Sequence, residues 1–102
     1  MKTNNGQISA NKRMTARFDG HVQGVGFRYT AVNLASDLDV RGFVRNDMDG
    51  AVTVVAEGPE DVLLALVRRV KSSHLGRYII RDSVSWSQPT GEFRDFSVRY
   101  DD

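Results

Sequence analysis

Three glycines and an arginine lie close together between Gly20 and Arg28, and residues of these types at this spacing could bind an anion. The apolar pattern that begins at Phe27 is typical of a helix, so the glycines are expected to form a turn that ends at a helix N-terminus. Such a turn can direct several backbone N–H groups at one point, where the helix dipole also favours negative charge. Arg28 adds a permanent cation whose forked donors suit phosphate or carboxylate oxygens. This stretch therefore predicts an oxyanion site, best suited to a phosphoryl group.

Two better-known glycine motifs do not fit this stretch. A Walker loop ends in Gly-Lys-Ser or Gly-Lys-Thr, and the sequence contains neither triplet. A dinucleotide-binding fingerprint needs a third glycine at the position where this sequence has Tyr29. A tight strand-to-helix turn that binds no ligand explains the glycines and the arginine about as well, so these residues alone leave both interpretations open.

The composition is that of one globular domain without a strong charge. The chain has 102 residues, of which 40% are hydrophobic and 26% charged, and its formal net charge is +1. This balance gives no general electrostatic reason to bind nucleic acid or a membrane, so we expect neither partner. The sequence contains no cysteine, which excludes disulfides, thiolate nucleophiles and cysteine-based metal sites.

The apolar runs are short, and the first residues are polar. No run approaches the roughly 20 residues of a membrane span, and residues 1–13 lack the hydrophobic core of a secretory signal. We therefore expect a cytoplasmic protein with a disordered leader over residues 1–13 and one domain over residues 14–102.

The elements that would hold the glycine-rich stretch follow from the apolar pattern. Met14, Ala16 and Phe18 alternate with polar residues, as in a half-buried strand that leads into the stretch. The second strand ends next to Asn46, before a run of turn-forming residues that predicts a hairpin. In chain order, the pattern predicts a strand over 14–19, a helix over 26–38, strands over 40–45 and 51–57, a helix that begins near 59, and strands over 77–87 and 93–100.

This order of elements predicts an α+β fold of the ferredoxin-like βαββαβ type, with an antiparallel sheet, two helices on one face and an extra C-terminal strand. Right-handed crossovers would place the first and third strands side by side in the middle of the sheet. The glycine-rich stretch would follow the first strand and Asn46 would end the second. The sequence leaves open whether these two strand ends meet at one edge.

Two segments of the sequence resemble the signatures of the acylphosphatase family. The first is Gly20-x-Val22-Gln23-Gly24-Val25-Gly26-Phe27-Arg28, and the second is Gly42-Phe43-Val44-Arg45-Asn46-x-x-Asp49-Gly50-x-Val52. The helix start at Gly58-Pro59 is also similar, and the resemblance extends over residues 14–100. Two long signatures in the right order make this a specific match, which a lone glycine loop would not be.

The resemblance implies an enzyme that hydrolyses the carboxyl–phosphate bond of acyl phosphates to a carboxylate and inorganic phosphate, without a metal or an organic cofactor. It implies that Arg28 binds the phosphoryl group and that Asn46 positions the attacking water. The backbone N–H groups of the loop would surround the phosphoryl oxygens. These groups belong to His21, Val22, Gln23, Gly24, Val25, Gly26, Phe27 and Arg28. Related domains begin larger carbamoyl-transfer proteins with zinc-binding cysteines, which this sequence lacks, so we expect a stand-alone enzyme. We also expect it to be a monomer.

The residue types suit these roles. An acyl phosphate already has a good leaving group, so positioning and electrostatics are expected to do most of the work. The neutral amide of Asn46 can hold a water without placing a negative charge beside an anionic substrate. We expect no side chain to act as general base, and the substrate phosphate itself would take the proton.

Other candidate residues have simpler interpretations. His21 would contribute only its N–H group, with its side chain in solvent, and His74 would lie on the surface. Strand alternation places Arg45 on the face opposite to Asn46, so we assign it no catalytic role. Asp47 and Asp49 are expected to be turn residues rather than acid–base or metal-binding residues. The aromatic residues Tyr78, Trp86 and Phe96 are expected to pack.

Two other classes of function remain open. An RNA-binding module can share this order of elements, and Arg41-Gly42-Phe43-Val44 faintly resembles its aromatic strand signature, but Arg45-Asn46 occupies the expected aromatic positions. The fold could also serve a domain that senses a ligand or binds a partner without catalysis.

Overall fold

The computed structural model describes residues 11–100 and confirms the predicted α+β order of elements. The elements are β1 (Asn11–Gly20), α1 (Phe27–Ala35), β2 (Arg41–Asn46), β3 (Val52–Pro59), α2 (Glu60–Ser72), the 3-10 helix η2 (His74–Tyr78), β4 (Ile79–Ser87) and β5 (Phe96–Val98). The expected leader over residues 1–13 is wrong at its C-terminal end, because Asn11, Lys12 and Arg13 pair with β3. The rest of that leader, residues 1–10, lies outside the described residues.

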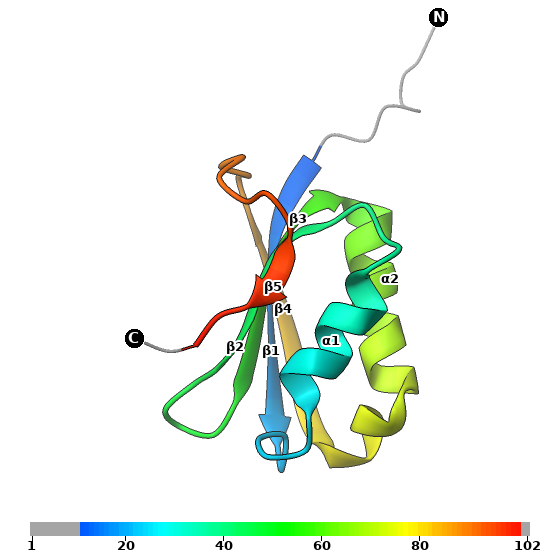
Figure 1. Ribbon diagram of the computed structural model, residues 1–102, viewed down its shortest axis with the longest axis vertical. Coiled ribbons are helices and arrows are strands. Elements are labelled where there is room, and N and C mark those ends of the chain that lie inside the picture. Colours follow the sequence, from blue (N-terminus) through cyan, green and yellow to red (C-terminus); the bar gives the residue numbers. More distant parts are fainter. Residues whose placement is uncertain (1–10, 101–102) are drawn as a thin grey trace, which may run out of the picture.

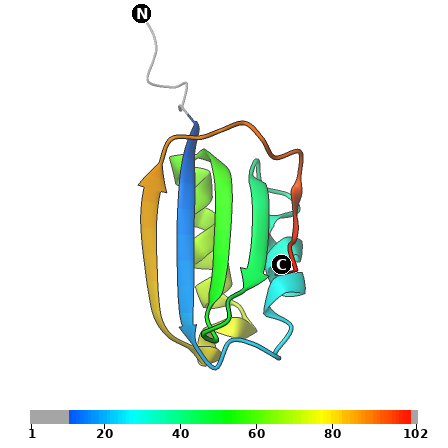
Figure 2. The ribbon, with the colours of Figure 1, turned by 90° about the vertical axis from the view of Figure 1, so that its left-hand side faces the viewer.

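The five strands form one sheet in the order β4-β1-β3-β2-β5. The predicted neighbours β1 and β3 lie side by side, and the pairs β1–β3, β1–β4 and β2–β3 are antiparallel. The extra C-terminal strand, whose placement the sequence leaves open, is β5; it runs parallel to β2 at one edge of the sheet. After β4 the chain crosses the end of the sheet to the far edge, so β5 enters beside β2 in the same direction (Figure 2).

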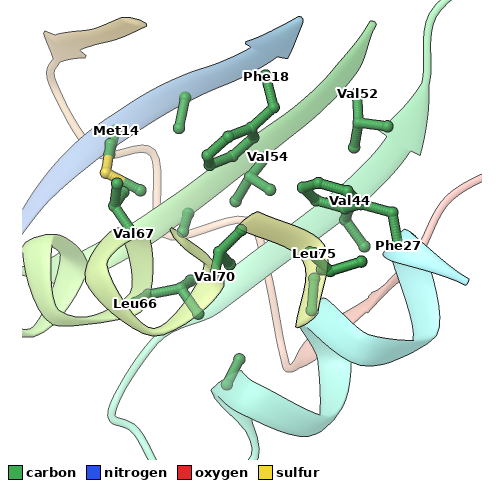
Figure 3. Packing of buried hydrophobic residues seen from close by; sticks show 14 of the residues in the cluster. Met14, Phe18, Phe27, Val44, Val52, Val54, Leu66, Val67, Val70 and Leu75 are labelled. Atoms are coloured by element: carbon green, nitrogen blue, oxygen red, sulfur yellow. The ribbon is translucent and has the colours of Figure 1, made fainter. Parts of the chain in front are cut away.

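Both helices cover one face of the sheet, and no helix covers the other face in the described part of the chain (Figure 1). Met14, Ala16 and Phe18 are fully buried under the helices, as the alternation predicts. Figure 3 shows Phe18 and Phe27 in this core, with their ring centres 5.3 Å apart. Burial of each large apolar side chain contributes about 1.5–3 kcal/mol. Within residues 11–100, neither helix has the length and apolar content needed to cross a bilayer.

The three aromatic residues expected to pack do so unequally. Tyr78 and Phe96 are partly buried against the core. Trp86 is 40% exposed, because β4 is an edge strand, and the Lys12 ammonium lies 5.8 Å from the centre of its ring.

The C-terminal ends of β1 and β2 lie at the same end of the sheet. These two strands run in the same direction on either side of β3 (Figure 2). Val52 of β3 lies opposite Phe18 on one side and opposite Asn46 on the other. Residues directly opposite each other share a face of the sheet, so Asn46 is on the helix-covered face with the buried Phe18. The loop after β1 and the end of β2 therefore approach one site from two strands.

Candidate active site

The loop over residues 21–26 ends at an uncapped helix N-terminus. Gly26 is the N-cap of α1 with φ 78° and ψ 22°, a left-handed conformation that glycine adopts without strain. No side chain caps this end, and the first turn has no acidic residue. Among residues 11–100, no backbone carbonyl accepts a hydrogen bond from the N–H groups of Gly24, Gly26, Phe27 or Arg28. These donors are open to an anion, which the helix dipole also favours.

The start of the loop is held by a backbone hydrogen bond to Tyr78, which corrects the expectation that the N–H group of His21 binds phosphate. The N–H group of His21 donates to the carbonyl oxygen of Tyr78 at 2.9 Å, so it is not free to bind a phosphoryl oxygen. Gly20 allows this approach, because a Cβ there would lie 2.2 Å from the same carbonyl oxygen. The side chain of His21 is exposed, as predicted. His74 is also exposed.

Arg28 and Asn46 line the same pocket, which has a volume of about 230 Å³. The other lining residues come from the loop and the first turn of α1: Val22, Gly24, Gly26, Phe27 and Tyr29. The lining thus holds five of the eight loop residues predicted to bind phosphate. It contains no carboxylate and no imidazole.

Three predicted loop residues do not line the pocket. They are His21, Gln23 and Val25. Val25 is partly buried against the hydrophobic core. Gln23 contacts the hairpin between β2 and β3, where its side-chain Nε2 donates to the carbonyl oxygens of Asp47 and Ala51 at 2.7 and 2.9 Å.

The guanidinium of Arg28 lies against an aromatic ring. Its central carbon is 5.0 Å from the centre of the Tyr100 ring, and the Tyr100 hydroxyl is 2.6 Å from the hydroxyl of Tyr29. That hydrogen bond raises the pKa of Tyr100. Among residues 11–100, no carboxylate forms an ion pair with Arg28. The charge of Arg28 is therefore available to a ligand in the pocket.

Sequence reasoning did not predict Tyr29 or Tyr100 near the site. Tyr29 follows Arg28 but lies off the buried stripe of α1, which Phe27, Ala31 and Ala35 form. An aromatic residue outside the apolar stripe of a first helical turn is the signal that could have marked it. Tyr100 reaches the site only because β5 runs parallel to β2.

Asn46 is the last residue of β2 and is half-buried. The hairpin after it closes with the N–H of Asp47 donating to the Ala51 carbonyl at 2.8 Å and the N–H of Gly50 donating to the Asp47 carbonyl at 3.1 Å. The Asp49 carboxylate accepts the N–H of Ala51 at 3.2 Å, which confirms its expected turn role. This tight turn fixes the backbone on the C-terminal side of Asn46.

The opposite face of this hairpin carries an ionic cluster. The Asp47 carboxylate accepts hydrogen bonds from the Thr53 hydroxyl at 2.6 Å and from Arg45 Nε at 3.1 Å. Arg45 thus lies away from the pocket, as strand alternation predicts. A hydrogen bond from Arg17 is the main reason why the pKa of Asp49 lies below its ordinary value.

The described residues offer no metal site of the common kind. Within residues 11–100, no three side chains of His, Cys, Asp or Glu are grouped to hold a metal ion. The pocket presents N–H donors and a guanidinium, which are ligands for anions.

Comparisons with known proteins agree on one family. The acylphosphatase family model matches residues 14–98. An acylphosphatase from Salinibacter ruber is 41% identical over 93 residues, which cover 91% of this chain and 98% of the relative. An acylphosphatase from Arthrobacter sp. (strain FB24) is 44% identical over 88 residues, which cover 86% and 81%. The crystal structure of acylphosphatase from Bacillus subtilis superposes with a TM-score of 0.79 at 36% identity, covering 87% of this chain and 99% of that one.

Proposed function

The chain belongs to the acylphosphatase family and is an enzyme with acylphosphatase activity, and from this premise we propose how its pocket performs the reaction. The phosphoryl group of an acyl phosphate binds between the guanidinium of Arg28 and the N–H groups of the loop. The side-chain amide of Asn46 holds the attacking water. The products are a carboxylate and inorganic phosphate.

The phosphoryl oxygens are bound by donors that are in place before the substrate arrives. The N–H groups of Gly24, Gly26 and Phe27 have no backbone acceptor among residues 11–100, and the helix N-terminus adds a favourable dipole. Negative charge on the equatorial oxygens grows or spreads in the transition state, so fixed donors there lower the barrier.

The water attacks phosphorus on the side opposite to the leaving carboxylate. The new bond joins the water oxygen to phosphorus, and the bond between phosphorus and the acyl oxygen breaks, with its electron pair going to the carboxylate. The pocket lining has no carboxylate or imidazole, so the proton of the water passes to a phosphoryl oxygen of the substrate. The amide of Asn46 orients the water through its acceptor and donor atoms.

The observation that carries this proposal is the presence of Arg28 and Asn46 in one pocket, with the uncapped N-terminus of α1 beside them. These two residues belong to different elements of the fold. Because both line one pocket, they can act on the same substrate.

Two substitutions separate the two roles. Arg28→Ala removes charge-assisted hydrogen bonds of about 1.5–3 kcal/mol, so the inhibition constant of inorganic phosphate should rise ~10- to 150-fold. Asn46→Ala should lower kcat for benzoyl phosphate ~100-fold or more while phosphate inhibition changes little. Steady-state kinetics with phosphate as competitor measures both effects.

The controls remove the same side chains away from the pocket. Arg81, which is highly exposed on β4, and Asn33, which is exposed on α1, serve as Arg81→Ala and Asn33→Ala. Both should keep the kinetics of the natural sequence. Full activity in Asn46→Ala would rule out the water-positioning role.

Three further expectations stay predictions: the cytoplasmic location, the monomeric state and the lack of a nucleic-acid partner. Light scattering after gel filtration measures the second, and a filter-binding assay at low salt measures the third.

A further inference from the structure

The side chain of Gln23 joins the loop over residues 21–26 to the hairpin that carries Asn46. Its Nε2 atom donates one hydrogen bond to the carbonyl oxygen of Asp47 at 2.7 Å and another to that of Ala51 at 2.9 Å. These acceptors lie 24 and 28 residues further along the chain. Among residues 11–100, no other hydrogen bond connects the loop over 21–26 to the hairpin over 46–51.

The chemistry of the partners fixes the orientation of this amide. A backbone carbonyl only accepts, so the two hydrogens of the Gln23 amide must face the hairpin. The reversed amide would point its oxygen at two carbonyl oxygens and lose both bonds. Each of the two carbonyls also accepts one backbone hydrogen bond, from Gly50 and from Asp47. The two lone pairs of each oxygen are therefore all used, and the junction accepts no alternative arrangement of equal quality.

The position of this junction relates it to the reaction. Asp47 directly follows Asn46, and Gln23 lies between Val22 and Gly24, which both line the pocket. The loop is otherwise anchored at its other side, by the bond between His21 and Tyr78. A change at Gln23 therefore alters how the loop sits relative to Asn46, rather than the composition of the pocket.

We propose that Gln23 is a positioning residue that sets the distance between the bound phosphoryl group and the water held by Asn46. Its side chain touches neither, and acts by holding the two backbones together. This inference rests on the proposed function of Asn46, because a junction of this kind matters for turnover only if the water is held from the hairpin. A misplacement of about 1 Å between reacting groups can cost about 100-fold in rate.

The test uses Gln23→Met, which keeps the length of the side chain but removes both donors. We expect kcat for benzoyl phosphate to fall ~10- to 100-fold, while the inhibition constant of inorganic phosphate changes less than about threefold. The same substitution in an Asn46→Ala background should lower kcat by less than about twofold, because the water is no longer positioned. A merely structural role would not produce this dependence on Asn46.

Arg69→Met is the matched control. Arg69 donates to the backbone carbonyl of Leu34 at 2.9 Å, so this variant also loses a bond between a side chain and a distant backbone. It should lower the unfolding temperature without changing kcat. Gln23→Glu is the second variant, with the shape of glutamine but acceptors in place of donors, and its kcat should be at least as low as that of Gln23→Met.

The outcomes separate this inference from the proposed function. A slow Asn46→Ala together with an unchanged kcat in Gln23→Met or Gln23→Glu would overturn only the role of Gln23. So would an equal loss from Gln23→Met in both backgrounds, or a phosphate inhibition constant that rises as much as kcat falls. An unchanged kcat in Asn46→Ala itself would instead overturn the proposed function.

Discussion

An aromatic ring, rather than an ion pair, holds the guanidinium of Arg28 in position. It lies 5.0 Å from the ring centre of Tyr100, whose hydroxyl is bonded to that of Tyr29. A cation held over an aromatic face keeps its full charge for a ligand, whereas a carboxylate partner would neutralise part of it. The ring thus restrains Arg28 at little electrostatic cost.

Replacement of the ring should weaken phosphate binding modestly. A cation–π contact at an exposed site contributes about 0.5–1 kcal/mol, so Tyr100→Leu should raise the inhibition constant of phosphate ~2- to 5-fold. Tyr100→Phe keeps the ring and loses only the bond to Tyr29, so it should stay closer to the natural sequence. Equal effects of the two variants would show that the hydroxyl pair, not the ring, restrains Arg28.

At the scale of single residues, the sequence predicted the chemical roles of residues better than their hydrogen-bond partners. The residue type of Arg28 marked it as a candidate, the resemblance to the second family signature marked Asn46, and both line the pocket. His21 was wrongly given a free N–H group, because its acceptor is the carbonyl of Tyr78, far along the chain. The bonds of Gln23 to Asp47 and Ala51 were missed for the same reason. Such partners become neighbours only once the strands have paired.

Among the elements, the crossing between β4 and β5 depends on one buried carboxylate. Glu57 of β3 is 8% exposed and accepts the N–H groups of Thr90 and Gly91 at 2.8 and 2.9 Å. Burial raises the pKa of this carboxyl, but the two N–H groups and the Thr90 hydroxyl outweigh it, so the pKa lies below its ordinary value. Arg13 approaches the same carboxylate at 3.4 Å.

Glu57→Gln should therefore destabilise the fold in a way that depends on pH. A charged acceptor of several hydrogen bonds is worth more than a neutral one, so the free energy of unfolding should fall by about 1–3 kcal/mol at pH 7. Because the folded pKa is lowered, this stability is present above the ordinary pKa of about 4.3 and is lost as the pH falls through the folded value. Urea unfolding at neutral pH and near pH 3 measures the difference, which should shrink in acid. A difference that stays constant over this range would contradict the role of the charge.

The sequence predicted the strands and α-helices from β1 to β4 because each has a clear apolar period or turn signal. It missed the 3-10 helix η2 (His74–Tyr78), because it assigned Arg77 and Tyr78 to the strand that begins only at Ile79. It predicted one strand over 93–100, whereas β5 covers only Phe96–Val98 and runs parallel to β2. Its direction follows from the path of residues 88–95 across the end of the sheet, held by Glu57 (Figure 2). That path depends on a contact across 33 residues, which no local pattern reveals.

In the whole molecule, the two histidines are exposed and neither lines the pocket. If the substrate takes the proton of the water, kcat should not follow the titration of an imidazole. We expect a flat profile of kcat from about pH 6 to pH 8, a range that includes the ordinary histidine pKa of about 6.5. A steep rise near pH 6.5 would point to a histidine general base instead.

The most direct test of the whole account is a titration of the 15N-labelled protein with inorganic phosphate, followed by amide chemical shifts. In the natural sequence and in Asn46→Ala, the largest shifts should fall on the backbone amides of residues 22–28, with similar affinity in both proteins. In Arg28→Ala these shifts should be lost over the same range of phosphate concentration. Shifts that centre on another part of the molecule, or that persist unchanged in Arg28→Ala, would contradict the claim that this loop and this guanidinium hold the phosphoryl group.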